Sequence, residues 1–145
     1  QKSSTRSKYD FEAGLLVQQG LEAAYNICLT NWASCAYGTY QISREFKPNS
    51  TTDFQWKLMP GSEVGIHTLF TRKIEIMEVC RKKAQGADGN SGQSYQPSPN
   101  PMTSLCVVNN LNELDPKSKL VRTTVPWEPN KKVSADLLLY DYSGN

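Results

Sequence analysis

The hydrophobic and polar positions of residues 9–31 repeat with the period of an α-helix. Apolar or small side chains recur at alternating spacings of three and four residues, and larger apolar side chains widen this stripe. The stripe comprises Gly14, Val17, Leu21, Ala24 and Cys28, and its flanks are Phe11, Leu15, Tyr25 and Leu29. The pattern predicts an amphipathic helix over residues 8–31, after a flexible leader at residues 1–7. The residues predicted to form its packing or assembly face are Val17, Leu21, Ala24 and Tyr25.

Two glycines fall inside the predicted helix, where each is unfavourable by about 1 kcal/mol relative to alanine. Gly14 lies on the apolar stripe, so we expect a closely packed neighbour that needs the space. Gly20 lies off the stripe, and the pattern gives no reason for it.

Beyond residue 36 the pattern changes to short runs in which apolar and polar residues alternate, as is typical of half-buried strands. Residues 63–83 are ambiguous between helix and strand, and their β-branched content favours strand. The last two strands are separated by five turn residues and predict a hairpin, with Pro126 placing the first of them beside a sheet edge. The predicted strands are residues 36–46, 54–59, 63–83, 104–110, 120–127 and 133–142.

Between the two β-rich parts, residues 84–102 are rich in Gly, Pro, Ser and Asn and predict a long exposed loop, which is either functional or mobile. The fold class predicted for residues 1–145 is therefore α+β. One N-terminal amphipathic helix packs on an antiparallel sheet built from residues 36–142, within a single domain.

Composition narrows the classes of function. The chain has 145 residues, 38% of them hydrophobic, and a net charge of +2 with its basic residues scattered among 14 acids. This distribution lacks the basic stripe of a nucleic-acid-binding protein. The longest aliphatic runs are three residues, far short of the roughly 20 needed to cross a bilayer. The chain starts with Gln1 and a polar, basic leader, so we expect cleavage of a signal peptide or a cut just after a membrane anchor.

Four cysteines, an even number, favour two disulfides in an exported protein over free buried thiols. No Cys-x-x-Cys motif occurs, and the single histidine lies far from any cysteine, so a zinc site is disfavoured. The runs EIMEVC and SLCVVNN both favour strands, and folding them back as neighbours pairs Cys80 with Cys106. Cys28 and Cys35 then form a local pair. This pair requires the helix to end between them, because seven helical residues would separate their backbones by about 10.5 Å.

Candidate catalytic residues are few. His67 is the only histidine, and the paired acids Glu75 and Glu78, or Asp136 and Asp141, are more typical of solvated strand and turn positions than of a hydrolase. The glycines of residues 86–92 lack the preceding strand and following lysine of a phosphate-binding loop. We therefore expect no enzyme, cofactor or metal site. Six aromatic residues are candidates for a sugar- or partner-binding patch, although core packing accounts for most of them: Tyr37, Tyr40, Trp56, Trp127, Tyr140 and Tyr142.

The order of these features resembles that of one known family. A polar start that looks cut downstream of an anchor is followed by an amphipathic helix with an Ala- and Gly-containing face, a loop, and a β-meander with cysteines towards the C-terminal half. This layout resembles the soluble domain of a type IV pilin or minor pilin. The resemblance implies a bacterial cell-surface filament, or fimbrium, with the helix packed into its core and the loops outward. It also implies that Cys80 and Cys106 match in position the disulfide that staples the C-terminal loop of many pilins.

We therefore expect a non-enzymatic structural protein of the bacterial cell surface or periplasm, with other filament or envelope subunits as partners. We expect no nucleic-acid partner, and membrane contact only through an anchor upstream of Gln1. The alternative is a secreted or periplasmic binding module or adhesin that uses residues 84–102 or the aromatic patch. An apolar stretch of about 20 residues directly upstream would favour the pilin-like interpretation, and a cleavable signal peptide would favour the module.

Overall fold

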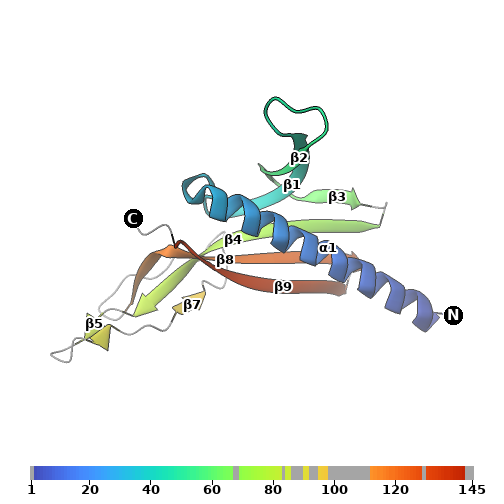
Figure 1. The fold of residues 1–145 in the computed structure, drawn as a ribbon. Helices are drawn as coiled ribbons and strands as arrows, with labels where there is room; N and C mark the ends of the chain where they lie inside the picture. Colours follow the sequence, from blue (N-terminus) through green and yellow to red (C-terminus); the bar gives the residue numbers. More distant parts are fainter. Residues whose placement is uncertain are drawn as a thin grey trace.

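A long helix lies across one face of an antiparallel sheet in the computed structural model of the protein (Figure 1). The residues that the structure describes are 2–66, 69–82, 84–85, 90–91, 95–97, 112–128 and 130–142. The predicted fold class, one N-terminal helix packed on an antiparallel sheet, is confirmed. Most of the predicted loop at residues 84–102 and the predicted strand at residues 104–110 lie outside the described residues.

Helix α1 (Lys2–Thr30) begins six residues earlier than the predicted start at residue 8, so the predicted flexible leader is helical from Lys2 onwards. The reason is that residues 2–7 contain neither Pro nor Gly, and each residue added to an existing helix contributes one more backbone hydrogen bond. The helix ends at Thr30, one residue from the prediction, and is followed by the short 3-10 helix η1 (Trp32–Ser34).

The main sheet has the strand order β2-β1-β4-β8-β9, and β3 and β7 also pair with β4. All its pairings are antiparallel. Its strands are β1 (Gly38–Phe46), β2 (Phe54–Pro60), β3 (Glu63–Ile66), β4 (Phe70–Lys82), β7 (Tyr95–Pro97), β8 (Asn112–Glu128) and β9 (Lys131–Tyr140), and a separate pair is formed by β5 (Ala84–Gln85) and β6 (Asn90–Ser91). The strand interpretation of residues 63–83 is confirmed for β3 and β4.

The predicted C-terminal hairpin is confirmed by the pairing of β8 with β9, although β8 begins at Asn112, inside a predicted turn. The register between β8 and β4 runs as far as Thr124, so the missing N–H of Pro126 interrupts no hydrogen bond to β4. Strand β1 pairs with β4 over only three residues, Gly38 to Tyr40. Beyond them the β1–β2 hairpin leaves the sheet and projects from the body of the molecule (Figure 1).

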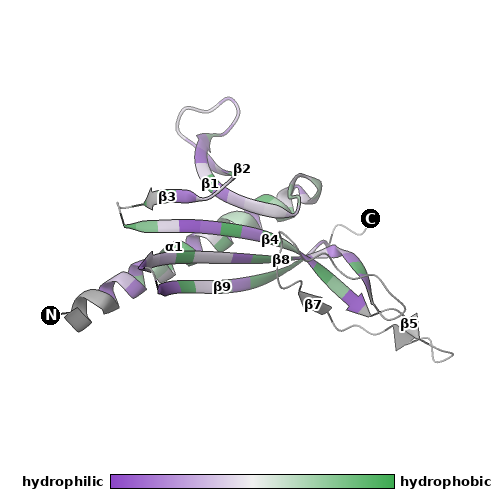
Figure 2. Ribbon diagram, turned by 180° about the vertical axis from the view of Figure 1, so that it is seen from behind, coloured by the Kyte–Doolittle hydropathy of each residue, from purple (hydrophilic) through white to green (hydrophobic). Residues whose placement is uncertain are grey.

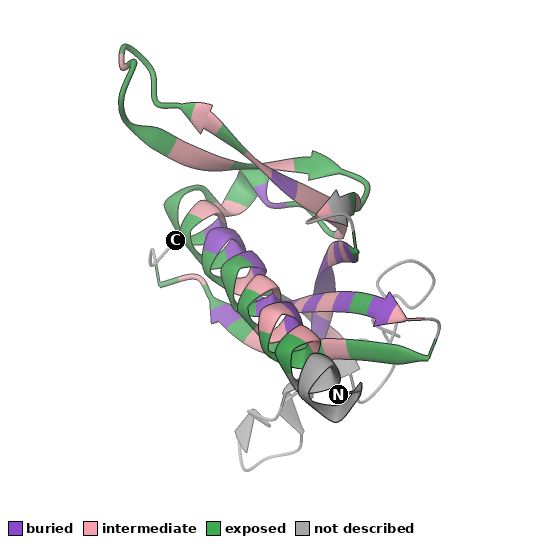
Figure 3. Cartoon of the chain, turned by 90° about the vertical axis from the view of Figure 1, so that its right-hand side faces the viewer, coloured by how far each residue is buried: buried purple, intermediate pink, exposed green. Residues whose placement is uncertain are grey.

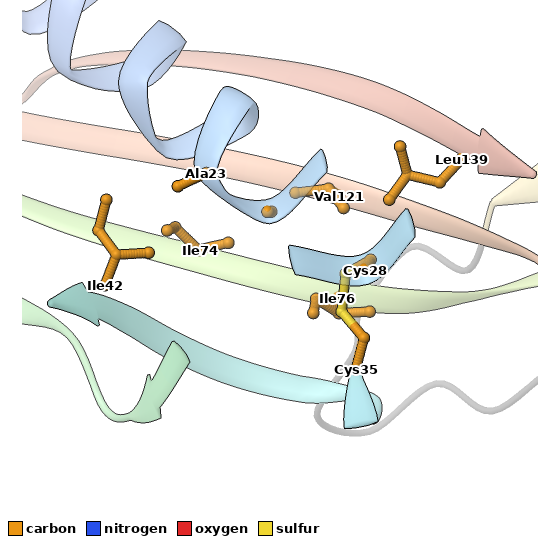
Figure 4. Close-up of a cluster of buried hydrophobic side chains, with 9 residues drawn as sticks. Ala23, Cys28, Cys35, Ile42, Ile74, Ile76, Val121 and Leu139 are labelled. Carbon is orange, nitrogen blue, oxygen red and sulfur yellow. A yellow bond between two sulfur atoms is a disulfide. The ribbon is translucent and has the colours of Figure 1, made fainter. Parts of the chain in front are cut away.

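Helix α1 lies on one face of the sheet and packs mainly over β8 and β9 (Figure 2). Two apolar clusters lie between the helix and the sheet. The larger one surrounds the C-terminal half of α1, and the smaller one joins Ala13 and Val17 to Phe70, Val125 and Trp127. The larger cluster, shown in Figure 4, contains Ala23, Ala24, Cys28, Cys35, Ile42, Ile74, Ile76, Val121 and Leu139.

The buried face of α1 includes most of the predicted apolar stripe, because Cys28 is fully buried. Val17 and Ala24 are buried against the sheet as predicted, and Leu21 is partly buried and packs against both clusters. Tyr25 is exposed, so it lies outside the face that packs on the sheet, and its predicted part in assembly stays a prediction. The flanks of the predicted stripe, Phe11, Leu15 and Leu29, are also exposed. Small residues line the buried face instead, because they let the helix backbone approach the flat surface of the sheet.

The close packing predicted at Gly14 is found at Gly20 instead. Gly20 is buried over β8, where an added Cβ would lie 2.8 Å from Thr123 Cγ2 and 3.1 Å from Thr123 Oγ1. Gly14 has no heavy atom within 4 Å of the position of an added Cβ, so the predicted close neighbour is absent there. The close contact between helix and sheet is therefore at Gly20.

Cys28 and Cys35 form the predicted local disulfide, with their Cα atoms 5.2 Å apart (Figure 4). The bond is possible because the helix ends at Thr30 and η1 turns the chain back. Cys80 is also disulfide-bonded, and its predicted partner Cys106 lies outside the described residues. The pairing of Cys80 with Cys106 therefore stays a prediction.

Candidate interaction surface on the outer face of the helix

The side of α1 opposite the sheet carries a second stripe, which we call the outer helix face. It is formed by Phe11, Leu15, Gln18, Glu22, Tyr25 and Leu29. Figure 3 views the helix from its N-terminal end, with exposed positions on the outside and buried positions towards the sheet. The exposed fractions of its four apolar side chains are 68% for Phe11, 51% for Leu15, 46% for Tyr25 and 38% for Leu29.

These six positions are spaced by four, three, four, three and four residues, which is the spacing of the a and d positions of a coiled coil. The stripe spans 18 residue steps, or about 27 Å of helix. Its centre is polar, because Gln18 Nε2 donates a hydrogen bond to Glu22 Oε1 at 3.2 Å. The outer helix face therefore has an apolar pair at each end and a polar pair in the middle.

A shallow groove of about 420 Å³ runs beside this stripe, between α1 and β9. Leu137 forms its sheet side, and its helix side is formed by Gln18, Leu21, Glu22, Tyr25 and Asn26. Large apolar side chains that are exposed together along one face are typical of surfaces that bind another protein. The sequence pattern contains this stripe. The pattern does not separate the exposed stripe from the buried one, because both have the same period.

The helix is held on the sheet by a buried ion pair that the sequence analysis missed. Arg72, from β4, is buried and forms hydrogen bonds to both carboxylate oxygens of Glu63 in β3, at 2.8 and 3.0 Å. The Nη1 atom of Arg72 donates to Leu16 O at 3.2 Å and to Gln19 Oε1 at 2.6 Å. One side chain thus links β3 and β4 to the middle of α1. Nothing in the sequence signals this ion pair, because β4 carries several other charged residues, among them Lys73, Glu75 and Glu78.

Lys119 fixes the turn at the C-terminal end of α1. Its Nζ donates to the carbonyl oxygens of Trp32, at 2.7 Å, and of Cys35, and it lies 4.5 Å from the centre of the Trp32 ring. Burial lowers the pKa of Lys119 to about 8, against the opposing effect of the Asp141 carboxylate. Together with the disulfide, this lysine holds the turn after α1 against β8.

A second concave surface lies between the C-terminal end of α1 and the β1–β2 hairpin. This cleft has a volume of about 750 Å³, within the range of small-ligand sites. Within the hairpin, Phe46 and Phe54 stack with their ring centres 4.6 Å apart, and the Arg44 guanidinium lies 4.3 Å from the centre of the Phe54 ring. The cleft is lined by Asn26, Ile27, Thr30, Asn31, Ser34, Lys47, Phe54, Gln55 and Trp56.

The aromatic residues predicted to form one patch lie in separate places. Trp127 is buried and packs on Tyr9 near the start of the helix, with ring centres 5.3 Å apart. Tyr140 and Tyr142 contact each other at the end of β9, with ring centres 4.9 Å apart. Trp56 lines the hairpin cleft. The other two predicted members are Tyr37, whose ring lies 5.9 Å from Lys119 Nζ, and Tyr40, which donates a hydrogen bond to Ala36 O.

The acid pairs considered as catalytic candidates are Glu75 with Glu78 and Asp136 with Asp141. Glu75 and Glu78 are three residues apart in β4, so their side chains project from opposite faces of the strand. Glu75 lies 3.8 Å from Lys73, and Asp136 forms an ion pair with Arg122 at 2.7 Å, on the sheet face opposite α1. His67 lies outside the described residues. Among the residues that the structure describes, no group of three metal-binding side chains comes together.

Comparisons with known proteins place the chain in no family. No family model, no curated protein and no solved structure matches it. No helix in the described part of the chain combines the length and hydropathy that a membrane span requires.

Proposed function

We propose that this protein is a non-enzymatic structural subunit of an extracytoplasmic assembly, similar in role to a pilin or minor pilin, and that its outer helix face contacts other subunits. The observation that carries the proposal is the exposure of Phe11, Leu15, Tyr25 and Leu29 along one side of a helix whose other side is packed on a sheet. A helix with apolar side chains on both sides is suited to lie between its own sheet and a partner.

The disulfides agree with an extracytoplasmic location at the cell surface or in the periplasm. Structural disulfides form and persist in oxidising compartments and are rare in the cytosol of mesophiles. Cys28 and Cys35 are fully buried, so their bond is part of the core.

The test of this function is assembly in the cell that encodes the protein. Leu15→Ser removes a large apolar side chain from the outer helix face, whereas Leu138→Ser makes the same change at an equally exposed leucine of β9, since each is 51% exposed. We expect the first variant to reach the same extracytoplasmic level as the wild type but to be lost from the sheared or pelleted surface fraction. Leu138→Ser should behave as the wild type does. Normal assembly of the Leu15→Ser variant would reject the proposal.

A second candidate function is a binding module or adhesin, and the hairpin cleft favours it. Its lining combines the aromatic rings of Phe54 and Trp56 with side-chain amides and hydroxyls, a combination suited to a polar ligand with an apolar face. Titration of the purified chain with an array of saccharides and peptides, followed by tryptophan fluorescence, tests this function. A ligand of the cleft should lose affinity with Trp56→Ala but keep it with Leu15→Ser.

A further inference from the structure

We propose that the partner of the outer helix face is a second copy of the same chain, with the two α1 helices antiparallel across a two-fold axis. This inference rests on the proposed function in that it uses the same surface, and it names the occupant of that surface. The juxtaposition that carries it is the symmetric order of side chains along the stripe, apolar at both ends and polar at the centre.

The stripe is symmetric about a point midway between Gln18 and Glu22. Turning a second copy about this point places Phe11 opposite the partner's Leu29 and Leu15 opposite the partner's Tyr25. In antiparallel coiled coils the a positions of one helix pack against the d positions of the other, as this arrangement requires. Four of the six layers along about 27 Å of paired helix are then apolar.

The central polar side chains select the antiparallel direction. In the antiparallel pair, Gln18 lies opposite the partner's Glu22, so an amide donor meets a carboxylate acceptor. The Gln18 amide has a second N–H, and Glu22 has a second oxygen, beyond those used in their 3.2 Å hydrogen bond within the helix. In a parallel pair, Glu22 would instead lie opposite the partner's Glu22. Like charges facing one another disfavour that direction.

The surroundings of the stripe leave room for a second helix. The open space at Gly14, which flanks Leu15, lets the partner backbone approach closely. On the β9 side, the groove formed by Leu21, Tyr25 and Leu137 receives the partner's Leu15 next to Tyr25. The dimer is thus a four-layer arrangement of sheet, helix, helix and sheet.

A two-fold contact of this kind is isologous and closes on itself, so it cannot by itself extend a filament. The dimer is therefore a form of the free protein. In it, each subunit covers the outer helix face of the other until the subunits join a larger assembly. Four apolar layers make a small interface, so the expected dissociation constant is on the order of 10–100 µM.

Sedimentation equilibrium of the purified, oxidised 145-residue chain between about 5 and 500 µM tests the inference. The apparent mass should rise from 16.3 kDa towards twice that value as concentration increases. Leu15→Ser should raise the dissociation constant at least about tenfold, because it alters two layers of the dimer. Leu138→Ser should leave it within about twofold of wild type.

Charge variants test the direction of the helices. For an antiparallel pair, Gln18→Lys faces the partner's Glu22 and should tighten the dimer about threefold to tenfold, whereas Gln18→Glu should weaken it by a similar factor. The double variant Gln18→Glu with Glu22→Lys should restore binding. A parallel pair would be weakened by this double variant, because like charges would face each other at both positions.

Three results would overturn the inference: a monomer at every concentration, equal effects of Leu15→Ser and Leu138→Ser, or weakening by Gln18→Lys. All these positions are exposed, so circular dichroism should show the same fold in every variant. A monomer in solution together with loss of surface assembly by Leu15→Ser would reject the dimer and leave the proposed function standing. A dimer in solution together with normal surface assembly of Leu15→Ser would support the dimer and reject the proposed function.

Discussion

Replacing each helix glycine by alanine tests the contact between α1 and the sheet at a single point. Gly20 and Gly14 lie in the same helix, and alanine is favoured over glycine by about 1 kcal/mol in a helix interior at either position. This propensity term is the same for both variants. Any difference between them reports what the new methyl group meets in the folded protein.

At Gly20 the new Cβ would lie 2.8 Å from Thr123 Cγ2, 3.1 Å from Thr123 Oγ1 and 3.4 Å from Arg72 Cδ. Thr123 is fully buried in β8 and β-branched, so its side chain has little freedom to move away. Overpacking of this kind costs roughly 1–3 kcal/mol. Gly20→Ala should therefore lower the free energy of unfolding by up to about 2 kcal/mol after the propensity gain. Gly14→Ala should raise it by about 0.5–1 kcal/mol, because nothing lies within 4 Å.

The measurement is urea-induced unfolding followed by tryptophan fluorescence, at about 2 µM protein so that self-association does not contribute. A double-mutant cycle with Thr123→Ser identifies the cause, since serine lacks the Cγ2 methyl group that the new alanine would meet. In the Thr123→Ser background, Gly20→Ala should be less costly by at least about 1 kcal/mol. Equal shifts for the two glycine variants, or a coupling below about 0.3 kcal/mol, would refute the reasoning.

Three further predictions concern the groups that hold the helix in place. Serine at both Cys28 and Cys35 should lower the free energy of unfolding by about 2.5 kcal/mol in the chain-entropy model, measured by urea titration against the oxidised wild type. Glu63→Gln should cost about 3 kcal/mol, because it leaves the buried Arg72 without its carboxylate, and a loss below about 0.5 kcal/mol would contradict the buried ion pair. Lys119 has a pKa of about 8 in the folded chain and an ordinary value of 10.5, so between these values the unfolded chain binds more protons and stability should rise with pH. The Lys119→Met variant should lack this rise in unfolding experiments from pH 7 to 10.5.

The local features of the fold follow from the sequence alone. The helical period of residues 9–31, the alternation in the later strands and the C-terminal hairpin are properties of neighbouring residues, and all three are found in the structure, although the strands continue into the predicted five-residue turn. The Cys28–Cys35 disulfide was also predictable. Its geometry depends only on where the helix ends, and that end is set within a few residues of the pair.

Sequence reasoning placed Val17, Ala24 and Cys28 on the buried face but did not separate the exposed stripe from the buried one. Residues 9–31 contain two apolar stripes of the same period, one with the small residues Ala13, Gly20 and Ala24, and one with large residues such as Phe11 and Leu15. Periodicity cannot rank them. The shape of the sheet decides, because the backbone of α1 must come close enough to β8 for Gly20 to lie over Thr123.

The candidate sites could not be predicted from the sequence, because they too depend on contacts between segments that are far apart in the chain. The outer helix face exists because the small-residue stripe faces the sheet, and the hairpin cleft exists because β1 leaves the sheet after Tyr40. The buried Arg72 joins residues from α1 and β3 that are far apart in the chain. The sequence by itself determined which segments are helix and strand, since those preferences arise between near neighbours. Only the tertiary structure decided how closely α1 approaches the sheet and which of its large apolar side chains remain exposed, because this depends on the fit between two surfaces distant in sequence.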